Sequence, residues 1–248
     1  MTVATIRARL KRVRSLVVLA RFVRSMTTSL GRGRILAQAR GSRLFQPATV
    51  TRMDRHPDLF ELVATRLARH EAPRLLSFGC STGEEAFTLS SYLPHSLIDA
   101  IDANPACISQ ARRSAESLLA EGRLHASRIR FVCADIPNAL ASDGYDAVLC
   151  MSVLRHGDLE ARTPEICTAT LPFPRFAAAI DSLDRCLRPG GLLVLWGCSF
   201  RFADTPTAKR YRTVPSPNVR AQPGPFYGAD DRLLADAAYA DFVFFKLE

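Results

Sequence analysis

The stretch LLSFGCSTGEEAFTL, residues 75–89, decides the fold class. It joins a short apolar run, typical of a buried strand, to a turn bounded by Gly79 and Gly83 and then to a segment of helical character. Two adjacent carboxylates, Glu84 and Glu85, stand where this helix should begin. A strand, a glycine turn and a helix in this order are typical of the first unit of a parallel α/β sheet.

Strands and helices alternate on both sides of this turn. Residues 204–230 are rich in proline and polar side chains and show no regular pattern, whereas residues 241–248 have the composition of a last strand. Alternation at this spacing predicts an α/β fold with a doubly wound, mostly parallel, Rossmann-like sheet. We expect strands at residues 74–78, 96–102, 128–135, 145–153 and 190–199, and helices at residues 56–70, 84–93, 105–122 and 173–187.

The positive charge is concentrated at the N-terminus. Residues 1–53 contain twelve Arg or Lys and no Asp or Glu, in a chain of 248 residues with a net charge of +9. We therefore divide the chain into a basic, helical N-terminal arm, residues 1–46, and a domain, residues 47–248. Residues 6–20 place basic and apolar side chains on neighbouring helical stripes. Three interpretations stay open: a helix on an anionic membrane or nucleic acid, an Arg-rich targeting segment, and a solvated helix packed on the domain.

Composition limits the location and the kind of site. The longest apolar run in the arm, SLVVLA, is far shorter than the roughly 20 residues of a membrane span. The seven cysteines include no C-x-x-C pair, which favours reduced, buried thiols over a disulfide framework or a zinc site. We expect no metal and a cytoplasmic protein, with peripheral membrane attachment through the arm as the alternative. The oligomeric state is not indicated.

The glycine turn should lie in a ligand site, because doubly wound sheets bind ligands beyond the carboxyl ends of their strands. A nicotinamide dinucleotide prefers G-x-G-x-x-G and presents its pyrophosphate to the helix N-terminus. Glu84 and Glu85 occupy that end, and like charges about 4 Å apart repel by about 1 to 4 kcal/mol. The same carboxylates favour a cation. S-adenosylmethionine has a sulfonium, an ammonium and no phosphate, so it is the expected cofactor, ahead of NAD.

Two further acids end the next two strands. Asp102 suits ribose hydroxyls at the end of the second strand, and Asp135 suits an adenine amino group at the end of the third. Each alone has the ordinary alternative of a helix cap or loop carboxylate. Acids at three successive strand ends favour a nucleoside site, although Glu84 has a second interpretation as a structural partner of the helix dipole.

Several motifs resemble a known family. GCSTGEE, IDAIDANP, CADI, YDAVLC and CLRPGGLLVL together resemble class I S-adenosylmethionine-dependent methyltransferases. TRMDRHPDLF, residues 51–60, is similar to the T-x-F-F-R-x-P-x-x-F signature of the chemotaxis-type, CheR-like protein-glutamate methyltransferases. The resemblance covers about residues 47–200. Too few residues separate Arg113 from Ile129 for that family's β subdomain, which grips a receptor tail, so the receptor substrate is not carried over.

The resemblance implies a cofactor site. Arg55 would bind the methionine carboxylate of the cofactor, Glu85 its ammonium and Asp102 its ribose. Ser152 stands where the family has an asparagine that helps to hold the cofactor. The expected cofactor-binding residues are Arg55, Gly79, Ser81, Gly83, Glu85, Asp102, Ala103, Asp135, Ile136, Met151 and Ser152.

The cofactor sets the chemistry that the protein must support. A sulfonium is an activated methyl donor, so the protein must chiefly align a nucleophile and exclude water. No catalytic residue is identified. His156 is a candidate general base with a helix cap as its alternative, and Arg201 and Tyr211 are candidates for the pocket. The long connection of residues 157–176 covers either the acceptor pocket or only the sheet edge.

We therefore expect an enzyme that moves a methyl group from S-adenosylmethionine to an unidentified acceptor, a small molecule or a protein carboxylate. Two alternatives remain. One is an RNA methyltransferase that uses the basic arm. The other is a non-catalytic cofactor-binding module docked on nucleic acid or membrane.

Overall fold

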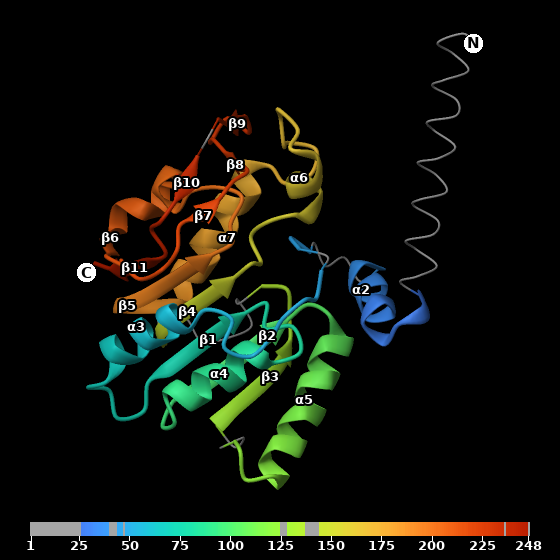
Figure 1. Ribbon diagram of the computed structural model, residues 1–248, viewed down its shortest axis with the longest axis vertical. Helices are drawn as coiled ribbons and strands as arrows, with labels where there is room; N and C mark the ends of the chain where they lie inside the picture. Colours follow the sequence, from blue (N-terminus) through green and yellow to red (C-terminus); the bar gives the residue numbers. More distant parts are fainter. Residues whose placement is uncertain are drawn as a thin grey trace.

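A seven-stranded sheet forms the centre of the computed structural model (Figure 1). The structure describes residues 26–39, 44–46, 48–124, 128–136, 144–235 and 237–247, so the expected helix at residues 6–20 lies outside the described residues. The strands of the sheet are β1 (Arg74–Phe78), β2 (Leu97–Asp102), β3 (Ile129–Cys133), β4 (Tyr145–Met151), β5 (Leu187–Trp196), β6 (Tyr211–Val214) and β11 (Val243–Lys246).

The order of the strands is β3-β2-β1-β4-β5-β11-β6. The first five pair in parallel, whereas β11 pairs antiparallel with both β5 and β6. This order confirms the doubly wound, mostly parallel sheet that the sequence predicts. The described helices are α2 (Ser29–Ala39), α3 (Pro57–Leu67), α4 (Glu84–Tyr92), α5 (Pro105–Ala120), α6 (Gly157–Arg162) and α7 (Phe173–Cys186), with short 3-10 helices η3 (Phe202–Asp204) and η4 (Pro206–Arg210).

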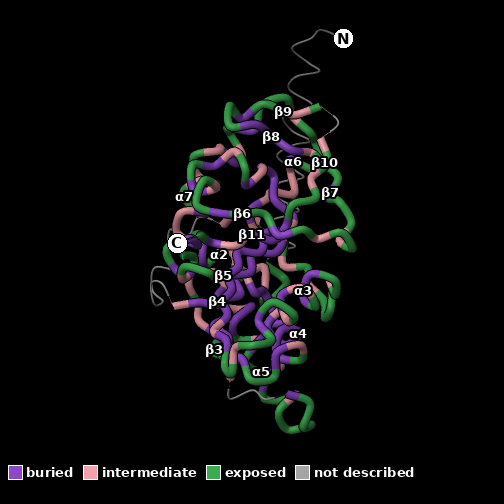
Figure 2. The backbone as a smooth tube through the Cα atoms, turned by 90° about the vertical axis from the view of Figure 1, so that its left-hand side faces the viewer, coloured by how far each residue is buried: buried purple, intermediate pink, exposed green. Residues whose placement is uncertain are grey.

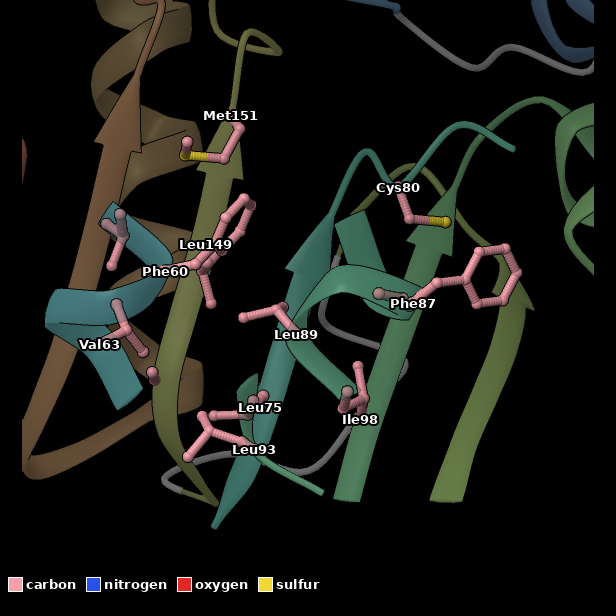
Figure 3. Close-up of a cluster of buried hydrophobic side chains, with 14 of the residues drawn as sticks. Phe60, Val63, Leu75, Cys80, Phe87, Leu89, Leu93, Ile98, Leu149 and Met151 are labelled. Atoms are coloured by element: carbon pink, nitrogen blue, oxygen red, sulfur yellow. The ribbon is translucent and has the colours of Figure 1, made fainter. Parts of the chain in front are cut away.

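Two apolar layers enclose the sheet. Helices α3, α4 and α5 cover one face, where Phe60 lies beside Leu149 of β4 (Figure 3) and the Phe87 ring lies 5.7 Å from that of Phe131 in β3. Helix α7 covers the other face, where Phe176 packs with Val148. Neighbouring residues of β4 thus enter opposite layers, as the alternation of side chains along a strand requires. All seven residues of β4 are buried, and the buried residues concentrate along the central strands (Figure 2).

The helix starts follow from local chemistry. Pro57 opens α3, where its missing N–H costs nothing. Asn104 caps α5, because its Oδ1 accepts a hydrogen bond of 3.0 Å from the backbone N–H of Ala106. These two helices frame the carboxyl edge of the sheet, where β1 and β2 end.

The C-terminal third departs from the expected simple pattern. Strand β6 was not predicted, and the strand expected at residues 241–248 inserts between β5 and β6. Two small sheets pair β7 (Gln222–Pro223) with β10 (Ala238–Tyr239) and β8 (Phe226–Tyr227) with β9 (Leu233–Leu234). These strands of two to four residues are too short to show a period in the sequence, so only their partners define them.

The connection at residues 157–176 contains α6 and is fastened to the C-terminal part of the chain. Asp231 accepts hydrogen bonds from Thr168 Oγ1 at 2.7 Å and from the backbone N–H of Phe173 at 2.6 Å. The backbone of Cys167 also donates to the carbonyl of Asp231. The connection therefore packs against residues that follow the last parallel strand.

The described part of the arm packs on the domain. Gly33 and Ala37 of α2 are buried, and the Nδ2 of Asn104 donates a 2.9 Å hydrogen bond to the carbonyl of Leu30. Helix α2 therefore packs on the domain, whereas the three interpretations of residues 6–20 and the boundary at residue 46 stay predictions. No described helix is long and apolar enough to cross a membrane. The seven cysteines are free, and only Cys133 is exposed.

Candidate functional site

A cavity of about 250 Å³ lies at the carboxyl edge of the sheet, where β1, β2 and β4 end. Cys80 and Met151, labelled in Figure 3, mark this edge near the ends of β1 and β4. Nine of the eleven expected residues line the cavity: Arg55, Gly79, Ser81, Glu85, Asp102, Ala103, Asp135, Met151 and Ser152. The fold thus gathers them in one place, and their binding of a cofactor stays a prediction.

The turn after β1 brings backbone to the cavity wall. Gly79 has φ +75°, and a Cβ there would lie 2.3 Å from a methyl group of Val153. Both facts require glycine. The backbone N–H of Ser81 donates a 2.9 Å hydrogen bond to Oδ2 of Asp102, which ties this turn to the end of β2.

The adjacent carboxylates Glu84 and Glu85 have different surroundings. Glu85 lines the cavity, and its Oε1 accepts a 2.6 Å hydrogen bond from Ser77 Oγ. Burial raises the pKa of Glu85 to about 7, against the opposing effects of that hydrogen bond and of Arg55. Glu84 instead accepts from Thr82 Oγ1 at 2.7 and 2.9 Å and is not among the lining residues, which agrees with its structural interpretation.

Asp102 joins two turns at the cavity. Besides the bond from Ser81, its Oδ1 accepts a 2.8 Å hydrogen bond from the backbone N–H of Asn104. Burial nevertheless raises the pKa of Asp102 above its usual value. An ionised carboxylate oxygen can accept more than one hydrogen bond, so both oxygens keep capacity for a ligand hydroxyl.

Basic and aromatic side chains line the cavity near the ends of β4 and β5. The Arg55 guanidinium lies 3.4 Å from Ser152 Oγ. Ser152 has φ +61°, a region in which asparagine is enriched among non-glycine residues. The His56 ring packs on Trp196, with 4.0 Å between ring centroids. Burial, then Arg55 and Arg52, lower the pKa of His56 to about 4, so the imidazole is neutral at pH 7.

Several expected residues lie outside the lining of the cavity. Gly83 does not line the cavity: it precedes α4 with φ +100°, where a Cβ would lie 2.8 Å from the Phe87 ring. Ile136 is 49% exposed and also lies outside the lining. His156 caps α6, because its Nδ1 accepts from the backbone N–H of Asp158 at 3.2 Å. The cap alternative is therefore confirmed, and His156 is not among the residues that line the cavity.

The remaining pocket candidates also lie elsewhere. No residue of the connection 157–176 lines the cavity, so the alternative in which it covers the sheet edge is the better description. Arg201 pairs with Asp204 at 2.9 Å, and Tyr211 donates to Asp184 at 2.7 Å. Both side chains are engaged away from the cavity.

The sequence did not predict the part of the cavity wall that lies N-terminal to Arg55. Arg34 of α2 and residues 44–46 and 48–52 line the cavity, and the carbonyl of Thr49 accepts a 3.0 Å hydrogen bond from Ser81 Oγ. His56 and Arg155 line it as well. His56 stands next to Arg55 inside the 51–60 motif, so this neighbourhood was the available signal. No periodicity indicates that an N-terminal segment crosses the edge of the sheet.

The family model described as a methyltransferase domain matches residues 76–193. No curated protein matches the sequence.

Solved structures provide distant likenesses. A methyltransferase of Geobacter sulfurreducens, in complex with S-adenosyl-L-homocysteine, has 23% identity and a TM-score of 0.39 and covers 58% of this chain. Magnesium protoporphyrin IX methyltransferase of Synechocystis, with bound S-adenosylmethionine, has 14% identity and a TM-score of 0.46 and covers 77% of this chain and 79% of its own. The chain spans about half of the Geobacter protein, 49%.

The site lies at the carboxyl ends of parallel strands, and the family match runs from β1 to β5. Residues 76–193 are therefore similar to a methyltransferase domain, and they hold the parallel, Rossmann-like part of the sheet.

Proposed function

We propose that the protein transfers a methyl group from S-adenosylmethionine to a carboxylate on a small molecule or a protein. The observation that carries the cofactor assignment is Glu85: a carboxylate that lines the cavity and whose pKa burial raises to about 7. A bound ammonium would reverse that shift, because an opposite charge favours the ionised form. When bound, the cofactor supplies a methyl group on a sulfonium, which is an activated donor.

The lining residues fit each part of this cofactor. Arg55 offers a planar guanidinium to the methionine carboxylate, and Glu85 offers a carboxylate to the ammonium. Asp102 has the capacity to accept from ribose hydroxyls, and Asp135 stands exposed at the cavity near the adenine position. The backbone at Gly79 has no Cβ to keep the ligand away.

The charges around the cavity favour an acceptor that is already anionic. Besides Arg55, which is assigned to the cofactor, Arg34, Arg52 and Arg155 line it. His56 is a weak base because its pKa is lowered to about 4, and Glu85 is assigned to the cofactor. A hydroxyl or amine acceptor would need a better base near pH 7. A carboxylate attacks without losing a proton, which is why we favour it.

Isotope transfer tests the function. The protein is incubated with deuteromethyl cofactor and a cell lysate, and the protein, RNA and small-metabolite fractions are then analysed for the label. We expect label that mild base releases as methanol, as a methyl ester requires. Base-stable label in RNA would establish the RNA alternative. Calorimetric binding of S-adenosylhomocysteine without label in any fraction would instead favour the non-catalytic module.

The finer likeness to chemotaxis-type enzymes is supported by Thr51, Arg55 and Phe60. These three positions of the 51–60 motif all line the cavity. The chain lacks the length for the family's β subdomain between α5 and β3. We therefore extend the likeness to the cofactor site and not to a receptor tail as substrate.

The basic arm is assigned an anionic partner as a separate proposal. The eleven basic and no acidic residues within positions 1–46 support it. A contact with phosphate groups predicts binding to anionic vesicles or RNA that weakens steeply between 50 and 200 mM salt. Deletion of residues 1–25 should abolish such binding, and binding that persists after deletion would contradict the assignment.

A further inference from the structure

Two buried nitrogens at the cavity have no hydrogen-bond partner. Within the described part of the chain, five buried side-chain nitrogen or oxygen atoms are unpaired, and two of them belong to cavity residues: Nε2 of His56 and Nε of Arg155. A buried polar atom without a partner costs about 1 to 3 kcal/mol. Such an atom in a native fold calls for an explanation.

The arrangement around Arg155 fixes its guanidinium. An ion pair joins its NH2 nitrogen to Glu160 of α6. Gly197 has no side chain, and a Cβ there would lie 3.2 Å from NH1 of Arg155 and 2.7 Å from Ser152 Oγ. Burial, then Arg55, lower the pKa of Arg155 below the usual arginine value. The guanidinium is thus oriented and desolvated before any ligand arrives.

His56 complements Arg155 as a second donor. Its ring is held against Trp196, and the neutral imidazole presents either a donor or an acceptor nitrogen according to its tautomer. The charged groups that affect it most are Arg55 and Arg52, both positive. A neutral ring beside guanidinium groups favours a ligand atom that carries negative charge.

We propose that His56 and Arg155 anchor an anionic group of the acceptor that is separate from the carboxylate receiving the methyl. This inference rests on the proposed function. Both nitrogens are shielded from solvent in the free protein, so an oxyanion reaches them only when the side chains of the cavity wall shift, and it then gains hydrogen bonds without stripping water from these nitrogens. Those bonds also occupy its lone pairs, which suits an anchor better than a nucleophile. The acceptor class is therefore a small acid with two anionic groups.

A matched pair of ligands tests the subsite. Glutarate and its monoamide, glutaramate, have the same shape and differ by one negative charge. Affinities are measured by calorimetry for both ligands, with and without saturating S-adenosylhomocysteine. In the unmodified protein we expect glutarate to bind at least tenfold more tightly. Equal affinities would overturn the inference.

Variants of Arg155 and His56 test whether these residues cause the preference for glutarate over glutaramate. Arg155→Gln should bring the two affinities within about twofold, and His56→Asn should reduce the preference in part. Arg162→Gln, on the exposed end of α6, should keep the full preference. A full preference in Arg155→Gln would place the anchor elsewhere and overturn the inference.

Two controls distinguish failure of the proposed function from failure of the two-anion inference. Unchanged S-adenosylhomocysteine affinity shows that Arg155→Gln is folded, and Arg155→Lys, which keeps the charge but loses the planar fork, should show an intermediate preference. If adenosylhomocysteine fails to bind the unmodified protein, the proposed function fails. If it binds but glutarate and glutaramate are equal, only the two-anion inference fails.

Discussion

At the residue scale, the cavity holds charges in places that do not stabilise the free protein. Glu85 is the main case, because its pKa lies near 7 instead of 4.5. The folded chain therefore holds this proton more tightly than the unfolded chain does between those two pH values. The contribution of Glu85 to stability is highest below pH 4.5 and falls as the pH rises through 7. Binding residues commonly carry such a cost.

Glu85→Gln should stabilise the free protein and weaken the binding of S-adenosylhomocysteine. At pH 8, without cofactor, we expect the melting temperature to rise, since the substitution removes a destabilising effect of up to about 3 kcal/mol. At pH 4.5 no rise is expected. Affinity for S-adenosylhomocysteine should fall by about 1 to 3 kcal/mol. Melting curves at both pH values measure the change in stability, and calorimetry measures the change in affinity.

Glu84→Gln is the matched control for that prediction. Glu84 bonds to Thr82 and does not line the cavity, so its substitution should leave the ligand affinity unchanged. In the unmodified protein, affinity should also decline as the pH falls below 7, because the protonated Glu85 no longer attracts the ammonium. Affinity that is equal at pH 6 and pH 8 would remove Glu85 from the ammonium site.

Asp102 combines a structural and a binding role. Asp102→Ala leaves the backbone N–H groups of Ser81 and Asn104 without their partner. We expect a loss of about 1 to 3 kcal/mol in the free energy of unfolding together with weaker cofactor binding. Urea unfolding and calorimetry measure the two effects. An undiminished ligand affinity would show that the carboxylate only holds the turns.

At the element scale, helix α2 is held by close approach to α5. A Cβ on Gly33 would lie 2.1 Å from Oδ1 of Asn104 and 2.6 Å from Cβ of Ala106. Glycine is therefore required here by packing, although it weakens the helix itself. Arg34, on the same helix, lines the cavity, so the docking of α2 affects the site.

Gly33→Ala tests this docking. Intrinsic propensity alone would gain about 1 kcal/mol, whereas forced overpacking costs about 1 to 3 kcal/mol. We expect the steric cost to prevail and α2 to become sensitive to limited proteolysis. Gln38→Ala, at an exposed position of α2, should not increase cleavage. If Gly33→Ala is instead more resistant than the unmodified protein, the close packing is not limiting.

At the scale of the whole molecule, the site is assembled from segments far apart in the sequence. Residues 48–52, the turn after β1, the end of β2 and the end of β4 all border one cavity. Residues 211–247 contribute none of the lining and instead close the far edge of the sheet. A bound ligand should therefore stabilise all the segments that border the cavity.

Hydrogen exchange tests that grouping. With S-adenosylhomocysteine at about 100 times its dissociation constant, the stability should rise by about 2.7 kcal/mol. Amides in residues 48–56, 79–85, 102–106 and 151–155 should gain protection beyond the rest of the chain. Local gains confined to residues 211–247 would contradict the assigned site. The Asp102→Ala protein at the same ligand concentration should show a smaller gain.

The sequence by itself determined the parallel core of this protein. The apolar runs of β1, β4 and β5 and the helical periods between them are local signals, and the structure confirms them. Nine of eleven expected site residues meet at one edge for the same reason: the carboxyl ends of parallel strands lie side by side. Gly83 and Ile136 lie outside the lining, because the neighbours of lining residues share the local sequence signal without facing the cavity.

Only the tertiary structure decided what lies around that edge. The insertion of β11 between β5 and β6, the wall from residues 44–46 and 48–52, and the place of His56 and Arg155 all depend on contacts between distant segments. The sequence pointed to His156 alone, but His156 caps a helix, whereas His56, which the sequence did not single out, lines the cavity. Local sequence determines the helices, strands and turns, because these depend on residues close together in the chain. The partners of a buried side chain come from segments far apart in the chain, so a short stretch of sequence does not reveal them.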